Sequence, residues 1–403
     1  MIKILHLGDI HLGYSYRSKN SALRSLLEGS IEKSFQRALE FSINNEIDLV
    51  IIAGDLFDFG PIGPKTFDFF IALVRKLRSK GIEVIYVLGN HDNLTLIQDN
   101  VMKTFREEMI IIDKAGVSEI NLKSKDGDLY NVYGVGHEFE KMNENLIKNY
   151  PCAKDDTSYN IGVAHCFVES AISSSGYDKY LPTTYEDLIS KNYNYFALGH
   201  IHLPSVYKDT NIAYCGSLQA LSFKEDGERG GNYVEIDKYG TSIKHMNFSS
   251  KLYKTVEVKI GSEDKDHVDL IEHIKTEVKR ELKDYNFKNT LLRINLSGHV
   301  SSTLMNLLEN EIEYISEQLN MSIESDYLLI KIDDVSLDYK SEDVVNQRHF
   351  LSYMLSKFDE DTDRVANDLI SNLSKNGVDI SKIDIVKCVE EIRESMLQSL
   401  IKR

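Results

Sequence analysis

The stretch DLVIIAGDLFD at residues 48–58 decides the fold class. Its five apolar residues, three of them β-branched, end abruptly at Gly54 and Asp55. A short apolar run bounded by turn residues is typical of a strand buried on both faces. In an open parallel sheet, ligands bind outside the carboxyl ends of the strands. We therefore expect Asp55 to stand at a binding edge.

Four further segments repeat this pattern of an apolar run that ends in polar residues. They are KILHLGDIH (3–11), EVIYVLGNHD (83–92), YNIGVAHC (159–166) and YFALGHIH (195–202). Between the first three predicted strands, apolar residues recur at spacings of three and four over about 22–45 and 64–80, which predicts helices. Alternation of strand and helix indicates parallel β-α-β units.

After about residue 250 the pattern changes to a small α+β arrangement. Strands are predicted at YKTVEVKI, TLLRINLSG and YLLIKIDDVSL, with helices between them over about 264–283 and 303–319. Amphipathic helices with apolar stripes are expected after that. The chain is therefore expected to have three parts, with linkers near 246–252 and 338–342: residues 1–250, 251–340 and 341–403.

Charge and cysteine usage restrict the class of protein. The 403 residues carry 47 Lys and Arg against 63 Asp and Glu, a net charge of −16, which disfavours strong unaided binding to a phosphate backbone. The four cysteines are scattered without CxxC pairing, and no apolar run approaches the length of a membrane span. A cytoplasmic location, without membrane association, is the expectation.

Seven polar residues at the predicted strand ends form a candidate metal site: Asp9, His11, Asp55, Asn90, His165, His200 and His202. The set mixes carboxylate, carboxamide and imidazole without thiolate. Such nitrogen and oxygen ligands suit two divalent ions, Mn²⁺ first, with Fe²⁺ or Mg²⁺ as alternatives, rather than a structural zinc. A glycine directly before Asp55, Asn90 and His200 would let backbone and ligand approach closely.

The order D-x-H, GD-x-x-D, GNHD, H and GH-x-H resembles the calcineurin-like metallophosphoesterases over about the first 205 residues. The resemblance implies an α/β fold, a β-sandwich with flanking helices, to which a capping domain and C-terminal helices are added here. It also implies two ions that share Asp55. One would be held by Asp9, His11, Asp55 and His202, and the other by Asp55, Asn90, His165 and His200.

Two further residues are candidates for catalysis. His91 is not needed as a metal ligand, so it is available to stabilise phosphoryl oxygens or to protonate the leaving group, and Asp58 would orient it. The reaction implied is hydrolysis of a phosphodiester by a hydroxide that two metal ions activate. Phosphatases of the superfamily carry Asp at the position of Asp58, whereas repair nucleases tend to carry His.

The segment AYCGSLQALSFKEDGERGGNYVEI at 213–236 resembles the closing strands of the bacterial SbcD-type nucleases. About 150 residues follow it, whereas protein phosphatases and small phosphodiesterases end near this point. This resemblance implies a DNA exonuclease and endonuclease subunit in double-strand-break repair. It further implies a homodimer, a capping domain that guides DNA, and C-terminal helices that dock on an SbcC-like coiled-coil ATPase.

Alternative interpretations stay open. The chain could be a metallophosphatase or phosphodiesterase for a small phosphoester, or an interaction subunit with weak catalysis. His6, inside the first predicted strand, is expected to be a buried structural histidine. His137, in YGVGHEFE, could either approach the substrate or serve only in packing.

Overall fold

The computed structural model describes residues 1–16, 21–153, 158–169, 180–261, 263–283, 287–337, 370–371 and 387–392. Apart from the last two short pieces, the predicted C-terminal helices lie outside the described residues. The chain divides into two compact units. The first comprises Met1–Thr255, Asp284–Arg293 and Ile323–Leu329, and the second comprises Val256–Lys283, Ile294–Ser322 and Ile330–Arg403.

Two six-stranded sheets form the centre of the first unit. The first sheet has the order β14 (Gly240–Asn247), β13 (Gly230–Asp237), β1 (Ile2–Leu7), β2 (Leu49–Ala53), β3 (Glu83–Val87) and β4 (Ile110–Ile112). The second has the order β11 (Ser205–Val206), β12 (Ile212–Tyr214), β10 (Tyr195–Gly199), β7 (Tyr159–His165), β6 (Leu129–Val135) and β5 (Ser118–Lys123). A separate two-stranded sheet pairs β8 (Val168–Glu169) with β9 (Thr183–Thr184).

The strands that carry the candidate ligands are parallel, as the sequence predicts. β1 pairs with β2, β2 with β3 and β3 with β4 in parallel, and β7 pairs in parallel with β10. Successive side chains of a strand point to opposite faces. In β2, Ile51 accordingly joins the core between the two sheets, whereas Val50 and Ile52 join the core under the helices. Both faces of this strand are therefore buried, which explains its continuous apolar run.

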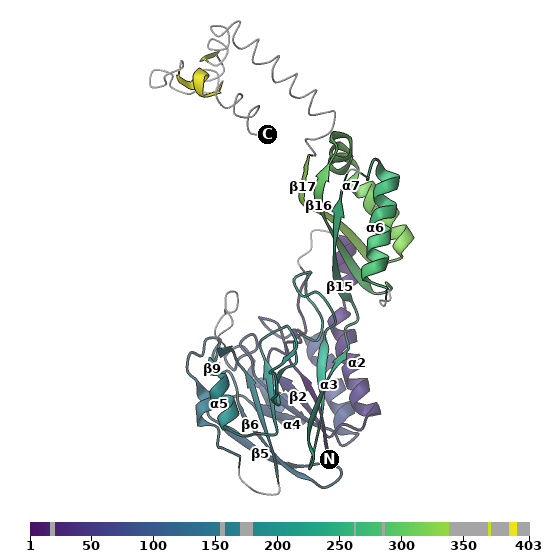
Figure 1. Cartoon of the computed structure of the whole chain (residues 1–403). Coiled ribbons are helices and arrows are strands. Elements are labelled where there is room, and N and C mark those ends of the chain that lie inside the picture. Colours follow the sequence, from purple (N-terminus) through teal and green to yellow (C-terminus); the bar gives the residue numbers. More distant parts are fainter. Residues whose placement is uncertain are drawn as a thin grey trace. The chain divides into compact units, whose positions relative to one another are not determined.

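Helices cover the outer faces of both sheets. Phe35, Phe70 and Phe105 pack α2 (Ser30–Asn44), α3 (Pro64–Arg78) and α4 (Asp99–Glu108) onto the first sheet. The second sheet packs against α5 (Tyr185–Ser190) and a short 3₁₀ helix at Leu146–Asn149. In Figure 1, α5 lies on the opposite side of the first unit from α2 and α3. This is a β-sandwich with flanking helices, so the predicted fold class is confirmed.

One predicted helix is in fact two. The pattern over 22–45 predicts a continuous helix, but α1 (Ser21–Leu27) ends before α2 begins at Ser30. Gly29 between them has φ = 73°, a left-handed conformation that ends a helix and that glycine adopts without steric cost. The apolar spacing survives the break because both helices present an apolar face.

The second unit contains most of a three-stranded sheet and the two helices that lie between its strands in the chain. The sheet has the order β15 (Leu252–Ile260), β16 (Thr290–Val300) and β17 (Tyr327–Leu337). The helices are α6 (His267–Glu281), which Asp266 caps through its side chain, and α7 (Ser302–Ile323). Among the described residues, no helix has both the length and the apolar character needed to cross a bilayer.

Candidate metal centre

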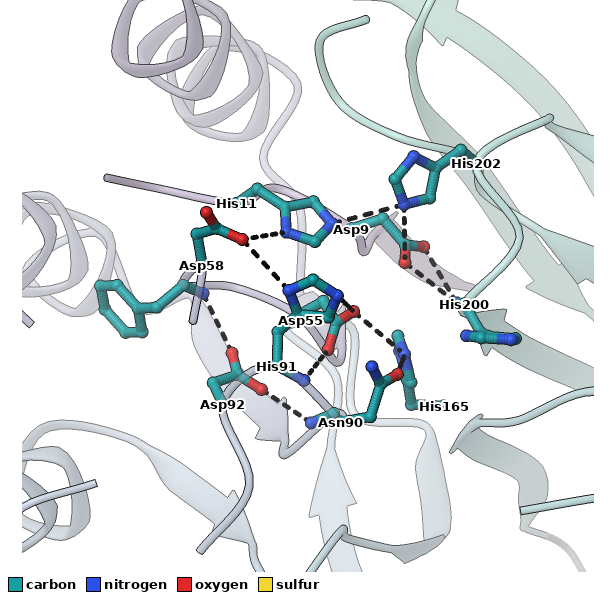
Figure 2. Close-up of polar contacts among 12 residues, drawn as sticks. Asp9, His11, Asp55, Asp58, Asn90, His91, Asp92, His165, His200 and His202 are labelled. Atoms are coloured by element: carbon teal, nitrogen blue, oxygen red, sulfur yellow. Dashed lines mark hydrogen bonds and ion pairs between the residues drawn. The ribbon is translucent and has the colours of Figure 1, made fainter. Parts of the chain in front are cut away.

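The turns after the parallel strands bring the candidate ligands of both sheets to one edge of the sandwich. The first sheet supplies Asp9, Asp55 and Asn90, and the second supplies His165 and His202. Figure 2 shows these side chains around a common centre. Such convergence follows from the topology, because the carboxyl ends of neighbouring parallel strands lie side by side.

The backbone at this edge adopts conformations that side chains rarely allow. Asp9, His11, Asp55 and His200 have φ values of 46°, 52°, 49° and 100°. A non-glycine residue at positive φ costs free energy and tends to cluster at functional sites, where the surrounding structure imposes it. Backbone strain is thus stored at four of the seven candidate ligands.

Three glycines allow the close approach that the sequence predicts. A Cβ atom on Gly89 would lie 2.2 Å from the Asp55 Oδ1 atom, and one on Gly54 would lie 2.2 Å from His165 Nδ1. A Cβ atom on Gly199 would lie 1.8 Å from the Ala53 carbonyl oxygen. The prediction about these glycines is confirmed, because a larger residue would displace a candidate ligand or its support.

Asp9, His11 and His202 form one group of possible ligand atoms. The Nε2 atoms of His11 and His202 face each other at 3.3 Å, and His202 Nε2 lies 3.8 Å from Asp9 Oδ1. Two imidazole nitrogens that face each other beside a buried carboxylate fit a cation between them, since each can offer a lone pair to it. The donor set therefore suits a divalent ion.

Asp9, Asp55 and His165 form a second group, so Asp9 is common to both. His165 Nε2 lies 3.3 Å from Asp55 Oδ2 and 2.9 Å from Asn90 Oδ1. On the far side of the ring, His165 Nδ1 donates to the Ala53 carbonyl oxygen at 2.9 Å. That bond leaves the Nε2 lone pair directed at the carboxylates, which is the arrangement of a metal-binding histidine.

His200 is placed differently from the other candidates. Its backbone N–H donates to both Asp9 oxygens, at 3.0 and 3.1 Å, but its side chain joins none of the groups of possible ligands found among the described residues. Its ring packs against the rings of His165 and Tyr180, and in Figure 2 it points away from His11. The structure thus gives His200 a contact with Asp9 through the backbone.

His91 and Asp58 lie together beside the first group. His91 Nδ1 is 3.1 Å from Asp58 Oδ1, which is also 3.6 Å from His11 Nδ1. The Phe59 ring covers one face of His91, with 3.7 Å between the ring centroids. His91 Nε2 lies 3.9 Å from Asp55 Oδ2. The ring is therefore oriented by Asp58 and faces the centre of the cluster.

Neighbouring carboxylates raise the pKa of two of the candidate histidine ligands. Although burial alone would lower it, the Asp55 carboxylate raises the pKa of His165 to about 9. Burial alone would also lower the pKa of His202, but Glu225 and Asp9 raise it to about 9. Burial raises the pKa of Asp9. Because metal ions bind only deprotonated ligands, cations and protons compete for this cluster.

Asp92 and Glu225 support the centre, although the sequence alone gives neither of them a role. Buried Asp92 accepts hydrogen bonds from the backbone N–H groups of Phe57 and Gly89 and from the Tyr86 hydroxyl, which ties two of the turns together. Glu225 accepts a hydrogen bond from His202 Nδ1 at 2.7 Å. The only sequence signal for Asp92 is its place in GNHD, and the only one for Glu225 is its place in the segment at 213–236.

His6 and His137 are both fully buried. His6 Nδ1 lies 2.7 Å from the Tyr195 hydroxyl, away from the candidate ligands, so the prediction of a buried histidine is confirmed. His137 Nε2 contacts the carbonyl oxygen of His165 at 2.8 Å. Of the two options for His137, the structure favours packing behind the centre.

A cavity of about 600 Å³ opens over these residues. Besides Asp55, Asn90, His91, His200 and His202, its lining comprises Phe59, Glu140, Tyr180, Leu203, Lys224, Glu225 and Arg229. Two cationic side chains and two exposed apolar side chains thus border a cluster of acids and imidazoles. The mixture suits an anionic substrate with an apolar part.

A model of the calcineurin-like phosphoesterase family matches residues 2–204. The chain belongs to this family. Calcineurin-like phosphoesterases hydrolyse phosphoesters and bind two divalent metal ions, and the groups around Asp9 and Asp55 provide candidate ligands for them. The match ends just after His202, so Glu225 lies beyond it.

Several relatives within the family resemble this chain at low identity. The uncharacterized metallophosphoesterase YhaO of Bacillus subtilis is 26% identical over 64% of this chain and 63% of its own length. The DNA double-strand break repair protein Mre11 of Archaeoglobus fulgidus is 27% identical over 56% of this chain and 52% of its own length. A subunit of the SbcCD nuclease of Escherichia coli K12 is 23% identical over 61% of this chain and 68% of its own length. The chain therefore spans about half to two thirds of the first two relatives.

Proposed function

We propose that this phosphoesterase is a metal-dependent DNA nuclease subunit that hydrolyses phosphodiester bonds and acts in DNA repair. The observation that carries the proposal is the convergence of Asp9, His11, Asp55, His165 and His202 beside the oriented His91. Relatives named as a repair protein and a nuclease subunit support DNA as the substrate class.

In this proposal the seven strand-end residues hold two divalent ions, most readily Mn²⁺. Asp9, His11, Asp55 and His202 serve one ion, and Asp55, Asn90, His165 and His200 serve the other, which requires the His200 ring to turn toward the cluster. When bound, two such ions activate a water molecule and neutralise the phosphate oxygens. His91, within reach of the same space, stabilises a phosphoryl oxygen or protonates the leaving oxygen.

The role of Asp58 follows from its contact with His91. A carboxylate at 3.1 Å from Nδ1 keeps the proton on that nitrogen and turns Nε2 toward the cluster. Burial alone would raise the pKa of Asp58, but His11 and His91 lower it. The Asp58 carboxyl group therefore stays anionic at neutral pH. His91 and Asp58 thus act as a catalytic pair.

The remaining parts of the proposal concern the whole chain. Residues 1–250 form the nuclease domain, 251–340 a capping domain that guides DNA, and 341–403 helices that bind an SbcC-like coiled-coil ATPase. The nuclease would work as a homodimer in the cytoplasm. The name of the Escherichia coli relative, which is one subunit of the SbcCD nuclease, supports the idea of a partner.

A phosphatase or phosphodiesterase for a small phosphoester is the second candidate. Asp58 favours it, because phosphatases of the superfamily carry Asp at this position and repair nucleases tend to carry His. The relative from Bacillus subtilis, which is named only as a metallophosphoesterase, is compatible with either substrate class.

One experiment separates the two candidates. The full chain is incubated with Mn²⁺ and with hairpin, linear duplex and single-stranded DNA, beside p-nitrophenyl phosphate. We expect cleavage of DNA that the His91→Ala variant loses. Rapid turnover of the small ester without any DNA cleavage, with and without the ATPase, would refute the nuclease proposal.

A further inference from the structure

Glu225 makes a short contact with His202, one of the candidate histidine ligands. Its Oε1 atom accepts from His202 Nδ1 at 2.7 Å, on the ring side opposite Nε2, which faces His11 and Asp9. We infer that Glu225 is a positioning residue of the metal centre, which fixes the His202 ring so that Nε2 points at the cation. This inference rests on the proposed role of His202 as a ligand.

The two oxygens of Glu225 have separate partners. While Oε1 contacts His202, Oε2 accepts from the backbone N–H of Leu221 at 3.0 Å and from the Ser217 hydroxyl at 3.3 Å. The carboxylate is therefore held from behind by its own loop. A histidine bonded to an immobilised acceptor loses less rotational freedom on binding a cation than one that must be ordered at that moment.

The charge of Glu225 adds to this geometric effect. The side chain of Glu225 is a carboxylate, which is ordinarily an anion at neutral pH. An anionic acceptor on Nδ1–H makes the opposite nitrogen more basic, and so a better ligand, than a neutral acceptor does.

His165 has a different kind of support from His202. His165 Nδ1 donates to a backbone carbonyl, that of Ala53, at 2.9 Å. The two imidazoles on the second sheet therefore have different supports, one neutral and part of the backbone, the other charged and a side chain. A substitution can remove the Glu225 side chain but not the Ala53 carbonyl group. The ion site that uses His202 can therefore be weakened while the support of His165 stays intact.

Glu225 lies outside the segment that matches the family. The family match ends at residue 204, and Glu225 stands in the connection between β12 and β13. Its neighbours Lys224 and Arg229 line the same cavity. This connection therefore completes the centre from outside the matched segment, by supplying a support for His202 and two cations at the cavity wall.

The test uses the full chain and titration calorimetry with Mn²⁺ alone. We expect Glu225→Ala to weaken binding of one Mn²⁺ about 10- to 100-fold, and Glu225→Gln, which keeps an acceptor but not the charge, to fall between it and the wild type. Glu140→Gln is the matched control, because exposed Glu140 lines the same cavity and the described contacts include none between it and a histidine. Its Mn²⁺ affinity should equal that of the wild type.

A double-mutant cycle separates positioning from a general effect on the loop. In the His202→Ala background, Glu225→Ala should change Mn²⁺ affinity by less than about twofold, because the group that it positions is gone. Its full effect persisting in that background would overturn the inference, as would an equal loss in Glu140→Gln. Thermal unfolding in chelator identifies variants that do not fold, and Glu225→Gln then carries the test.

The outcomes also distinguish the inference from the function on which it rests. If His202→Ala binds both ions like the wild type, the proposed ligand role fails. If His202→Ala loses an ion but Glu225→Ala does not weaken binding, only the positioning role fails.

Discussion

At the scale of single residues, Asp55 and His91 have different surroundings in the centre. Asp55 contacts His165 and lies near His91, whereas His91 is bonded to Asp58 at the edge of the cluster. Replacing Asp55 and replacing His91 should therefore have different consequences for metal content and for turnover.

We predict that Asp55→Ala loses bound metal and activity together, whereas His91→Ala keeps both ions and loses activity about 10²- to 10⁴-fold. The reason is that Asp55 is a shared ligand in the proposal and His91 is not a ligand. Metal analysis of the purified proteins and the rate of phosphodiester hydrolysis with Mn²⁺ measure the two effects. His299→Ala, which alters an exposed histidine of the second unit, should match the wild type in both. A His91→Ala protein without metal would contradict the assignment.

Buried His6 makes stability depend on pH. Burial lowers its pKa to about 3, whereas in the unfolded chain the ordinary value of 6.5 applies. Its contribution is therefore fully present above pH 6.5 and is lost as the pH falls toward 3, because the unfolded chain binds the extra proton first. Between these values the free energy of unfolding should fall by about 1.4 kcal/mol per pH unit more than in His6→Gln.

Urea unfolding of both proteins in chelator at about pH 7, 5.5 and 4.5 measures this difference. Groups other than His6 titrate equally in the two proteins and cancel. Parallel curves for the two proteins over this range would show that His6 is protonated in the folded state.

Most of the strands and helices that build the centre could be predicted, because long apolar runs and helical spacings are local signals. The strands that were not predicted are mostly those without such runs: β5 and β14 alternate half-buried with exposed residues. The break at Gly29 was missed because the periodicity continues across it. Glu225 was missed because its partner is 23 residues away and only the folded chain brings them together.

The turns at the strand ends depend on glycine for steric reasons. We predict that Gly89→Ala weakens Mn²⁺ binding at least tenfold and destabilises the fold by about 1–3 kcal/mol, because the added Cβ would lie 2.2 Å from Asp55 Oδ1. Gly63→Ala is the control, since it has an ordinary φ of −66° and no atom within 4 Å of the new Cβ. Calorimetric titration and urea unfolding give the two values. Equal Mn²⁺ affinity and equal stability of the two variants would mean that the turn at Gly89 can accommodate a Cβ atom.

At the scale of the whole molecule, the net charge of −16 opposes unaided binding of DNA. We predict that the isolated chain binds a duplex of about 30 base pairs only weakly at physiological salt, no more tightly than the about 10⁻⁴–10⁻⁶ M of non-specific binding. Addition of an SbcC-like ATPase should tighten binding by supplying a basic surface. Fluorescence anisotropy over a range of salt concentrations tests this. Tight binding by the chain alone, with a steep dependence on salt, would contradict the charge argument.

The candidate ligands come from two separate sheets, with Asp9, Asp55 and Asn90 on one and His165 and His202 on the other. Cations bound among them would crosslink the two sheets. Neither sheet alone carries all seven candidate ligands, so the centre is complete only after both sheets have folded and packed together. For a phosphoesterase this arrangement means that hydrolysis can begin only when the sandwich is assembled, so an unfinished chain stays inactive.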